Sequence, residues 1–260
     1  DLIEYLNAPA DGDVTNPNGG VDWAEVRAAN GHPKPYGVTR FEIGNEIGYY
    51  RQTYWMDGRG NTDWMDAYID GGRMTFGQNT RTVKEEDWRD QATNSDGTAN
   101  QVRYVRYTPA VEKSVAVYVG GTQWQIVDSL EGKGAKNVCT VDETTGKITF
   151  GDGTNGNIPQ SGQAITAAYQ SDRDGFKAYY QAMKQIAEEL NMDIQVYCGS
   201  GEQVSFVKKM AAKGYNAYYD GVVIHPYSDT SGVVIKDDDP EFYEKVLGRS
   251  QQHNMSRVKN

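Results

Sequence analysis

The chain has 260 residues, of which 24% are charged, and its formal net charge is −10 at pH 7. An acidic chain repels phosphate backbones, so this composition excludes nucleic acid as an expected partner. The length is sufficient for one large domain or two smaller ones. No apolar run approaches the roughly 20 residues that a membrane-spanning helix needs, so no membrane span is expected.

Aromatic residues make up 11% of the chain, with 18 Tyr and 5 Trp. This content suits a protein that stacks on sugar rings, and it equally suits a tyrosine-rich extracellular β protein. No signal peptide is recognisable, and the chain opens at Asp1 in what looks like the middle of a helix over residues 1–7. We therefore expect a fragment or a processed chain. The expected location of the protein is extracellular or at the cell surface.

The two cysteines, Cys139 and Cys198, lie in segments that we assign to different domains. A disulfide requires Cα atoms within about 7 Å of each other. Two buried apolar thiols are the better interpretation, because free cysteine behaves as a small hydrophobic residue.

Residues 8–20 are rich in Pro, Gly, Asp and Asn and are predicted to be a loop. Trp23–Ala29 is predicted to form a short helix with Asp22 as its N-cap. Gly31, Pro33 and Pro35 end this helix and lead into the next element.

Residues 40–43 alternate polar and apolar side chains, which predicts a strand, and Gly44 permits a turn after it. Asn45 and Glu46 then stand where the strand runs into a loop. In barrels of alternating strands and helices, chemistry occurs at that end. A partly desolvated carboxyl group there has a raised pKa and can donate a proton near neutral pH. The alternative is that Glu46 caps a helix or pairs with a surface arginine.

The run from Arg27 to Tyr36, followed by Val38 and by Phe41–Glu46, resembles the fourth-strand region of glycoside hydrolase family 51. Those enzymes are α-L-arabinofuranosidases and related retaining glycosidases on a (β/α)8 barrel. Residues 1–7 are similar to the family's helix three. The resemblance implies that Glu46 is the general acid/base and that Asn45 hydrogen-bonds a sugar hydroxyl.

After Glu46 the sequence departs from that family, because about 120 residues precede the next convincing helix. Short helices are predicted at 65–69 and 83–88. From about residue 101 the alternation predicts strands separated by turns. The strands are expected around residues 102–104, 115–119, 124–126, 147–150 and 165–169, with turns at Gly120-Gly121 and 142–146.

We therefore divide the chain into a barrel part at 1–50, an inserted and mainly β domain at 51–170, and a second barrel part at 171–260. The pattern from Val115 to Tyr169 resembles a small β module of phage-baseplate-type proteins, which implies a spacing or adhesive role. In its glycine-rich loop, Asp152 and Asn155 suit either a calcium ion or a turn, and the turn is the better interpretation.

The barrel pattern resumes at Asp174 with a helical stripe that runs from Phe176 to Leu190. A strand is expected at 193–198 and a helix at 203–213, with its inward face at the positions Val204, Val207 and Met210. The apolar run 222–224 is typical of a strand buried on both faces. Helix and strand alternate with short connections, which indicates βαβ units.

His225 and Tyr227 follow that last strand. They resemble the end of strand six of the same family, and the resemblance implies that both line the sugar pocket. Asp220 also matches, whereas Val223 stands where the family has Ser. The acidic run 237–239 is expected to be solvated, and a helix is predicted from Pro240 to about Gly248.

A retaining glycosidase needs two carboxylates about 5 Å apart. The resemblance puts the second, the nucleophile, at the end of strand seven, which these residues do not reach. Glu241 and Glu244 fall inside the predicted helix, so neither replaces it. We therefore expect these residues alone to be inactive.

The sequence thus predicts an α/β fold: a partial (β/α)8 TIM barrel, strands four to six, with a mainly β insert. The expected function is part of a retaining, arabinofuranosidase-like glycoside hydrolase without metal or cofactor. Its expected partners are an oligo- or polysaccharide and the remainder of the barrel on a longer parent chain. The alternative is a non-catalytic extracellular carbohydrate-binding or adhesive protein that retains part of a glycosidase barrel.

Overall fold

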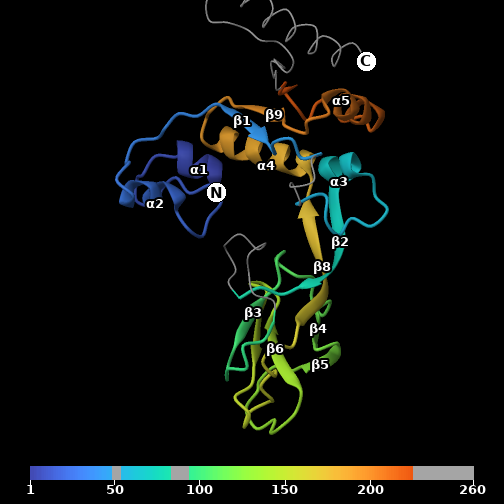
Figure 1. Ribbon diagram of the computed structural model, residues 1–260. Coiled ribbons are helices and arrows are strands. Elements are labelled where there is room, and N and C mark those ends of the chain that lie inside the picture. The colour runs from blue at the N-terminus through green and yellow to red at the C-terminus, as the bar shows by residue number, and fades with distance from the viewer. Residues whose placement is uncertain (49–53, 83–93, 225–260) are drawn as a thin grey trace, which may run out of the picture. The chain divides into compact units, whose positions relative to one another are not determined.

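The structure is a computed structural model that describes residues 1–48, 54–82 and 94–224. The chain divides into two compact units, with residues 1–56, 63–70 and 174–260 in unit 1 and residues 57–62 and 71–173 in unit 2. Helices and strands both occur, so the mixed α/β class is confirmed (Figure 1). The predicted helices at 83–88 and from Pro240 to Gly248 lie outside the described residues.

Unit 1 contains a parallel sheet of three strands in the order β1-β9-β10. The strands are β1 (Arg40–Ile43), β9 (Gln195–Cys198) and β10 (Gly221–Val222), and the helices are α1 (Leu2–Asn7), α2 (Trp23–Ala29), α3 (Trp64–Asp70), α4 (Phe176–Glu189) and α5 (Gln203–Ala212). The segment β9–α5–β10 is a βαβ unit, as the alternation of patterns predicted. Figure 1 shows α4 running beside β1 and β9.

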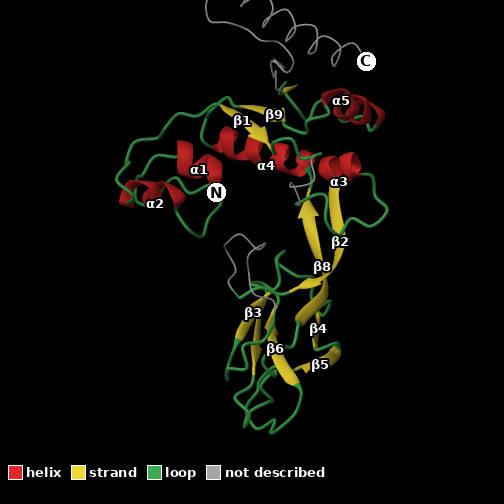
Figure 2. Cartoon of the chain, viewed as in Figure 1, coloured by secondary structure: helices red, strands yellow, loops and turns green. Residues whose placement is uncertain are grey.

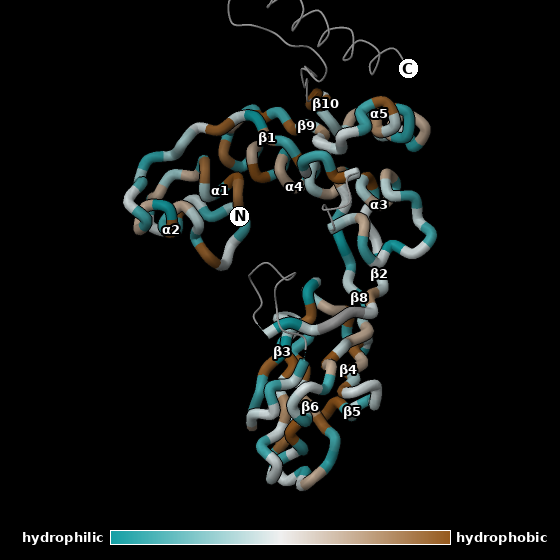
Figure 3. The backbone as a smooth tube through the Cα atoms, in the orientation of Figure 1, coloured by the Kyte–Doolittle hydropathy of each residue, from teal (hydrophilic) through white to brown (hydrophobic). Residues whose placement is uncertain are grey.

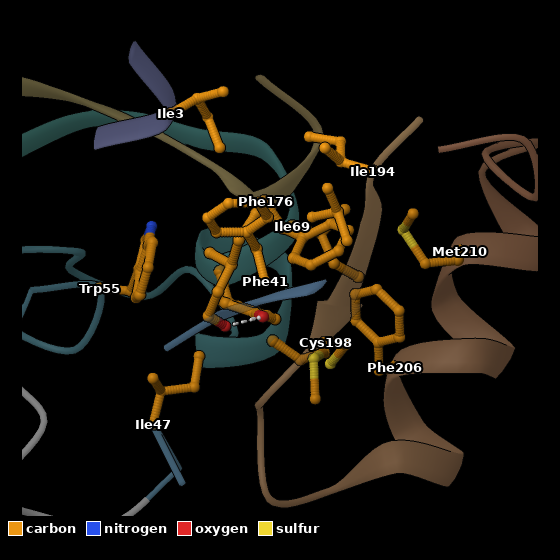
Figure 4. Close-up of a cluster of buried hydrophobic side chains, with 14 of the residues drawn as sticks. Ile3, Phe41, Ile47, Trp55, Ile69, Phe176, Ile194, Cys198, Phe206 and Met210 are labelled. Atoms are coloured by element: carbon orange, nitrogen blue, oxygen red, sulfur yellow. Dashed lines mark hydrogen bonds between the residues drawn. The ribbon is translucent and has the colours of Figure 1, made fainter. Parts of the chain in front are cut away.

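Sequence explains the local structure of α2 and α4. The side chain of Asp22 accepts a hydrogen bond from the Glu25 N–H at 2.9 Å, which confirms the predicted N-cap of α2. In α4 the predicted stripe faces the core, with Phe176, Ile186 and Ala187 buried. The apolar cluster of unit 1 combines side chains of α3, α4, α5 and the sheet (Figure 4).

The inward face of α5 differs from the predicted one. Phe206 and Met210 are fully buried, whereas Val207 packs partly against the core and Val204 is only half-buried. Phe206 and Met210 are four residues apart and therefore lie on one side of the helix. Phe206 therefore takes the central inward position, and Val204 lies at the edge of this face.

The prediction that residues 222–224 are buried on both faces is wrong. Val222 and Val223 are half-buried, and Ile224 is 44% exposed. Within the described part of the chain β10 pairs only with β9, so it forms the edge of this sheet. An edge strand has a neighbour on one side only, and this explains the exposure.

Unit 2 contains a sheet of seven strands in the order β2-β8-β4-β5-β6-β7-β3, and every regular element in its described part is a strand (Figure 2). All pairings that the structure details are antiparallel except β5 with β6. The strands are β2 (Gly71–Asn79), β3 (Val102–Tyr104), β4 (Ala116–Val119), β5 (Thr122–Ile126), β6 (Val138–Asp142), β7 (Lys147–Phe150) and β8 (Ile165–Asp174).

The predicted turns at Gly120-Gly121 and at 142–146 connect β4 to β5 and β6 to β7. Both glycines of the first turn have positive φ, 55° and 81°, as a two-residue hairpin of this kind requires. Burial alternates along β8, and brown and teal positions follow one another closely along this unit's strands in Figure 3. Alternation of this kind builds the core of a sheet with one buried face.

The sequence pattern did not predict β2. Its residues include three glycines and few β-branched side chains, so the local signal for a strand is weak. The strand forms because it lies beside β8 in the sheet, where Met74 and Phe76 are buried. Pairing with a distant segment therefore decided its conformation.

Candidate active site

Strand β1 brings the candidate residues to the end of a parallel sheet. Its apolar residues Phe41 and Ile43 are 8% exposed, whereas Arg40 and Glu42 are exposed on the opposite face. The strand pairs with β9 in parallel, from Arg40 opposite Gln195 to Ile43 opposite Cys198. The carboxyl ends of both strands therefore lie at the same edge.

Asn45 and Glu46 follow directly in a tight turn. Gly44 has φ of 81°, and a Cβ atom there would lie 2.6 Å from a methyl carbon of Ile47, so no other residue fits without rearrangement. Glu46 itself has φ of 51°, which is uncommon for a residue other than glycine. Asn45 is exposed, Glu46 is half-buried and Ile47 is buried at 2% exposure.

The turn thus leaves Asn45 and Glu46 at least partly accessible and buries Ile47 in the core. Glu46 is half-buried as a whole residue, whereas the sequence predicts partial desolvation of its carboxyl group. Residues held in sparsely populated backbone regions are concentrated at functional sites. The arrangement places a carboxyl group and an amide side by side in the chain at the strand ends.

The loop after β9 completes this edge. The backbone N–H of Gly199 donates to the Ile43 carbonyl at 3.3 Å, and the Gly48 N–H donates to the Ser200 carbonyl at 3.3 Å. A Cβ atom at Gly199 would overlap the Glu42 carboxyl group and the Gly44 carbonyl. Glycine at this position therefore lets the two strand ends approach each other.

Glu42 is a further carboxylate near this edge that the sequence did not single out as a candidate. It lies opposite Tyr197 on the exposed face of the sheet, four residues before Glu46. The alternation along the strand already indicated its position, because it places Glu42 on the face opposite Phe41 and Ile43. The family resemblance drew attention to the Asn-Glu pair alone.

A pocket of about 590 Å³ lies beside β1. Its lining is mainly apolar and includes Phe41, Ile43, Trp55, Tyr179 and Met183, with further lining residues Asp1, Leu2, Ile3, Asn18, Glu42, Gly44, Ala182 and Ile186. The Trp55 indole N–H donates to the Asp174 carbonyl at 2.9 Å. The volume lies in the range of small-molecule sites. Asn45 and Glu46 are not among the lining residues, so the pocket adjoins the turn rather than enclosing it.

Both cysteine thiols are buried and remain neutral, Cys198 at the end of β9 and Cys139 in β6 of unit 2. Burial raises the pKa of the Cys198 thiol, and burial raises the pKa of the Cys139 thiol to about 12. Both cysteines are free and buried, as predicted. Thiols with raised pKa values are poor nucleophiles at neutral pH, so neither is a candidate catalytic group.

Asp220 has a structural role in the described residues. Its carboxylate accepts the Val196 N–H at 2.7 Å and lies 2.9 Å from the Lys184 ammonium. Burial alone would raise the pKa of this carboxyl group, but Lys184 and the Val196 N–H hold it below its ordinary value. Asp220 therefore ties the start of β9 to the chain that leads into β10. His225 and Tyr227, the other two predicted residues of this segment, lie outside the described residues.

The glycine-rich loop of unit 2 has the hydrogen bonds of a turn. One carboxylate oxygen of Asp152 accepts the N–H groups of Thr154 at 2.8 Å and Asn155 at 2.6 Å. The Asn155 side-chain oxygen accepts the Gly132 N–H at 3.0 Å. These bonds explain the Asp and Asn residues by backbone geometry, which supports the turn interpretation. In residues 1–48, 54–82 and 94–224 no group of three or more His, Cys, Asp or Glu side chains is arranged to hold a metal ion.

None of the helices in the described ranges is long and apolar enough to cross a membrane. Comparisons with curated proteins and with solved structures returned no match. Residues 1–67 match the family model of the alpha-L-arabinofuranosidase 1 domain. The matched segment contains α1, α2, β1 and the turn with Asn45 and Glu46. This part of the chain is thus similar to an arabinofuranosidase domain, and the similarity indicates a glycoside-hydrolase-like function.

Proposed function

We propose that the chain carries the acid/base part of a retaining glycoside hydrolase of the α-L-arabinofuranosidase type. Glu46 protonates the leaving oxygen and later deprotonates the attacking water, and Asn45 binds a sugar hydroxyl. One observation carries the proposal: Glu46 follows the carboxyl end of a parallel strand inside the segment that is similar to the arabinofuranosidase domain. The substrate is an oligo- or polysaccharide outside the cell or at its surface.

In this proposal unit 1 is part of a (β/α)8 barrel, in which β1, β9 and β10 are strands four to six. The parallel pairing, the shared edge of the strand ends and the βαβ unit support it. The nucleophile and the other strands belong to the remainder of the barrel on a longer parent chain. In the described residues β1 pairs only with β9, so its other edge is where a further barrel strand would pair. The insert proposed at residues 51–170 corresponds largely to unit 2, although residues 51–56 and 63–70 pack in unit 1. His225 and Tyr227 line the sugar pocket in this proposal.

The first test uses the 260-residue chain with aryl α-L-arabinofuranosides. We expect no turnover above background, because one carboxylate cannot complete a retaining double displacement. Turnover well above background would show that the nucleophile lies within these residues.

The second test uses a chain extended through the strand that would supply the nucleophile. Glu46→Gln should lower the rate about 10²–10⁴-fold on natural oligosaccharides, because their leaving groups need a proton. The loss in kcat/KM, which reports the step that releases the leaving group, should be much smaller on a dinitrophenyl arabinofuranoside, whose leaving group departs without protonation. Glu188→Gln, an exposed carboxylate on α4, is the matched control and should leave both rates unchanged. Equal losses on the two substrates would remove Glu46 from acid catalysis.

A second candidate function is non-catalytic carbohydrate binding or adhesion at a cell surface. Unit 2, whose described elements are all strands, favours it, because such a unit adds surface without adding a barrel strand. If the extended chain retains a polysaccharide in a pull-down but turns over no glycoside, this candidate replaces the enzyme.

A further inference from the structure

Helix α3 holds the end of β1 through one buried side chain. The Tyr68 hydroxyl donates a hydrogen bond of 2.6 Å to the Ile43 carbonyl, the last of the strand (dashed in Figure 4). Tyr68 is fully buried, and the Gly199 N–H donates to the same carbonyl at 3.3 Å. Burial raises the pKa of Tyr68 well above its ordinary value, so the hydroxyl keeps its proton.

The ring of Tyr68 also lies against the turn that follows the strand. A Cβ atom at Gly44 would lie 3.8 Å from a ring carbon of Tyr68 and 3.6 Å from one of Trp55. Beyond Gly44, Glu46 has φ of 51° and Ile47 is buried in the same apolar cluster as Tyr68. A left-handed conformation at a residue with a side chain has an energetic cost and persists where its surroundings hold it.

We propose that Tyr68 is a positioning residue for Glu46. Its hydroxyl fixes the Ile43 carbonyl and its ring supports Gly44, so that the backbone presents the Glu46 carboxyl group in one orientation. The inference rests on the proposed function, in which Glu46 is the acid/base. Positioning matters there because a displacement of about 1 Å can cost roughly 10²-fold in rate.

The first experiment uses Tyr68→Phe in the 260-residue chain, with Tyr197→Phe as the control. Tyr68→Phe keeps the ring, and the Ile43 carbonyl retains the Gly199 N–H. The Tyr197 hydroxyl donates to the Gln195 side chain at 2.6 Å, so its loss removes one tyrosine hydrogen bond elsewhere on the sheet. NMR measures the one-bond Cα–Hα coupling of Glu46, which reports the sign of φ, and Glu46→Gln assigns the signal.

Tyr68→Phe should move the Glu46 coupling away from its positive-φ value, whereas Tyr197→Phe should leave it unchanged. An unchanged coupling in folded Tyr68→Phe, or an equal change in the control, overturns the inference. Failure of the proposed function shows separately, as an unchanged rate of Glu46→Gln in the extended chain, and the coupling still decides the role of Tyr68.

A double-mutant cycle with Glu46→Gly covers the case in which Tyr68→Phe does not fold. Glycine adopts positive φ without strain, so a residue that holds this conformation should matter less in that background. Tyr68→Phe should raise the equilibrium constant for unfolding in both backgrounds. The rise should be at least about five-fold larger in the chain with native Glu46 than in the chain with Glu46→Gly. If Tyr68→Phe alone is unfolded, the double variant should fold. Equal effects in both backgrounds, or a double variant that also fails to fold, overturn the inference.

Discussion

At the residue scale, Arg27 shows how one side chain organises the approach to the candidate site. It is fully buried, and its guanidinium donates to the carbonyls of Tyr5 at 2.7 Å, His32 at 2.9 Å and Pro33 at 3.1 Å. The segment that enters β1 is thereby fastened to α1. The planar guanidinium with its five donors suits three acceptors in different directions, which a lysine ammonium does not reproduce.

Arg27→Met should therefore destabilise unit 1 by about 2–4 kcal/mol, because buried carbonyls lose their donors. Arg27→Lys should recover only part of this loss. Urea unfolding followed by circular dichroism measures both, and Arg40→Met, at an exposed arginine of β1, should stay within about 0.5 kcal/mol of the unsubstituted chain. A change in Arg27→Met as small as the control would contradict the role assigned to this side chain.

At the element scale, α3 and α5 are joined by a set of ion pairs as well as by the core. Lys209 lies 2.8 Å from Asp66 and 3.3 Å from Asp63, and Lys213 lies 3.2 Å from Asp66 and 2.8 Å from Asp70. The hydrogen bond from Lys209 holds the pKa of Asp66 below its ordinary value. Since α3 contains Tyr68, this contact also fixes the helix that supports the Glu46 turn.

Asp66→Asn should lower the stability of the chain at pH 7 by about 1 kcal/mol, because the pairs are partly buried and share charges. The folded-state pKa of Asp66 is depressed, so its contribution is present above the unfolded pKa of about 3.9 and is lost as the pH falls through the lower folded value. The difference between the variant and the unsubstituted chain should thus shrink as the pH falls from about 3.9 and vanish below the lower folded-state pKa. Unfolding curves at several pH values test this, with Glu112→Gln, in the exposed Lys113 pair, as a control that should show no effect.

The elements also show what local sequence predicts well. The cap at Asp22, the stripe of α4 and the glycine turn between β4 and β5 were predicted correctly because each depends on residues close in sequence. Strands β2 and β6 were not predicted, and the burial of residues 222–224 was predicted wrongly. β2 has a weak local signal and forms beside β8, and the exposure of Ile224 follows from the position of β10 in the sheet.

At the scale of the whole molecule, each unit has its own core. Phe206 is fully buried in unit 1 and contacts the rings of Tyr68 and Phe176, whereas Phe150 is fully buried in unit 2 beside Trp124. Aromatic residues at such positions dominate the stability of a core. The chain crosses between the units four times, after residues 56, 62, 70 and 173.

We expect two cooperative unfolding transitions in calorimetry. Phe206→Ala should lower one midpoint and Phe150→Ala the other, since each substitution removes about 3–5 kcal/mol from a single core. Tryptophan and tyrosine fluorescence of the two variants assigns the transitions. A single transition that both substitutions shift equally would mean that the two cores unfold as one.

The sequence by itself determined the local elements and the order in which they occur, because capping, turn chemistry and hydrophobic period act over a few residues. It also identified Asn45 and Glu46 as the exit of a strand, from the glycine and the alternation before them. Only the tertiary structure decided that β1 and β9 end at the same edge, that Tyr68 bonds the last carbonyl of β1, and that Glu42 lies on the exposed face beside Gly199. These relations join residues that are 25 to more than 150 positions apart, and parallel pairing and close packing, which bring such segments together, leave little trace in the local pattern.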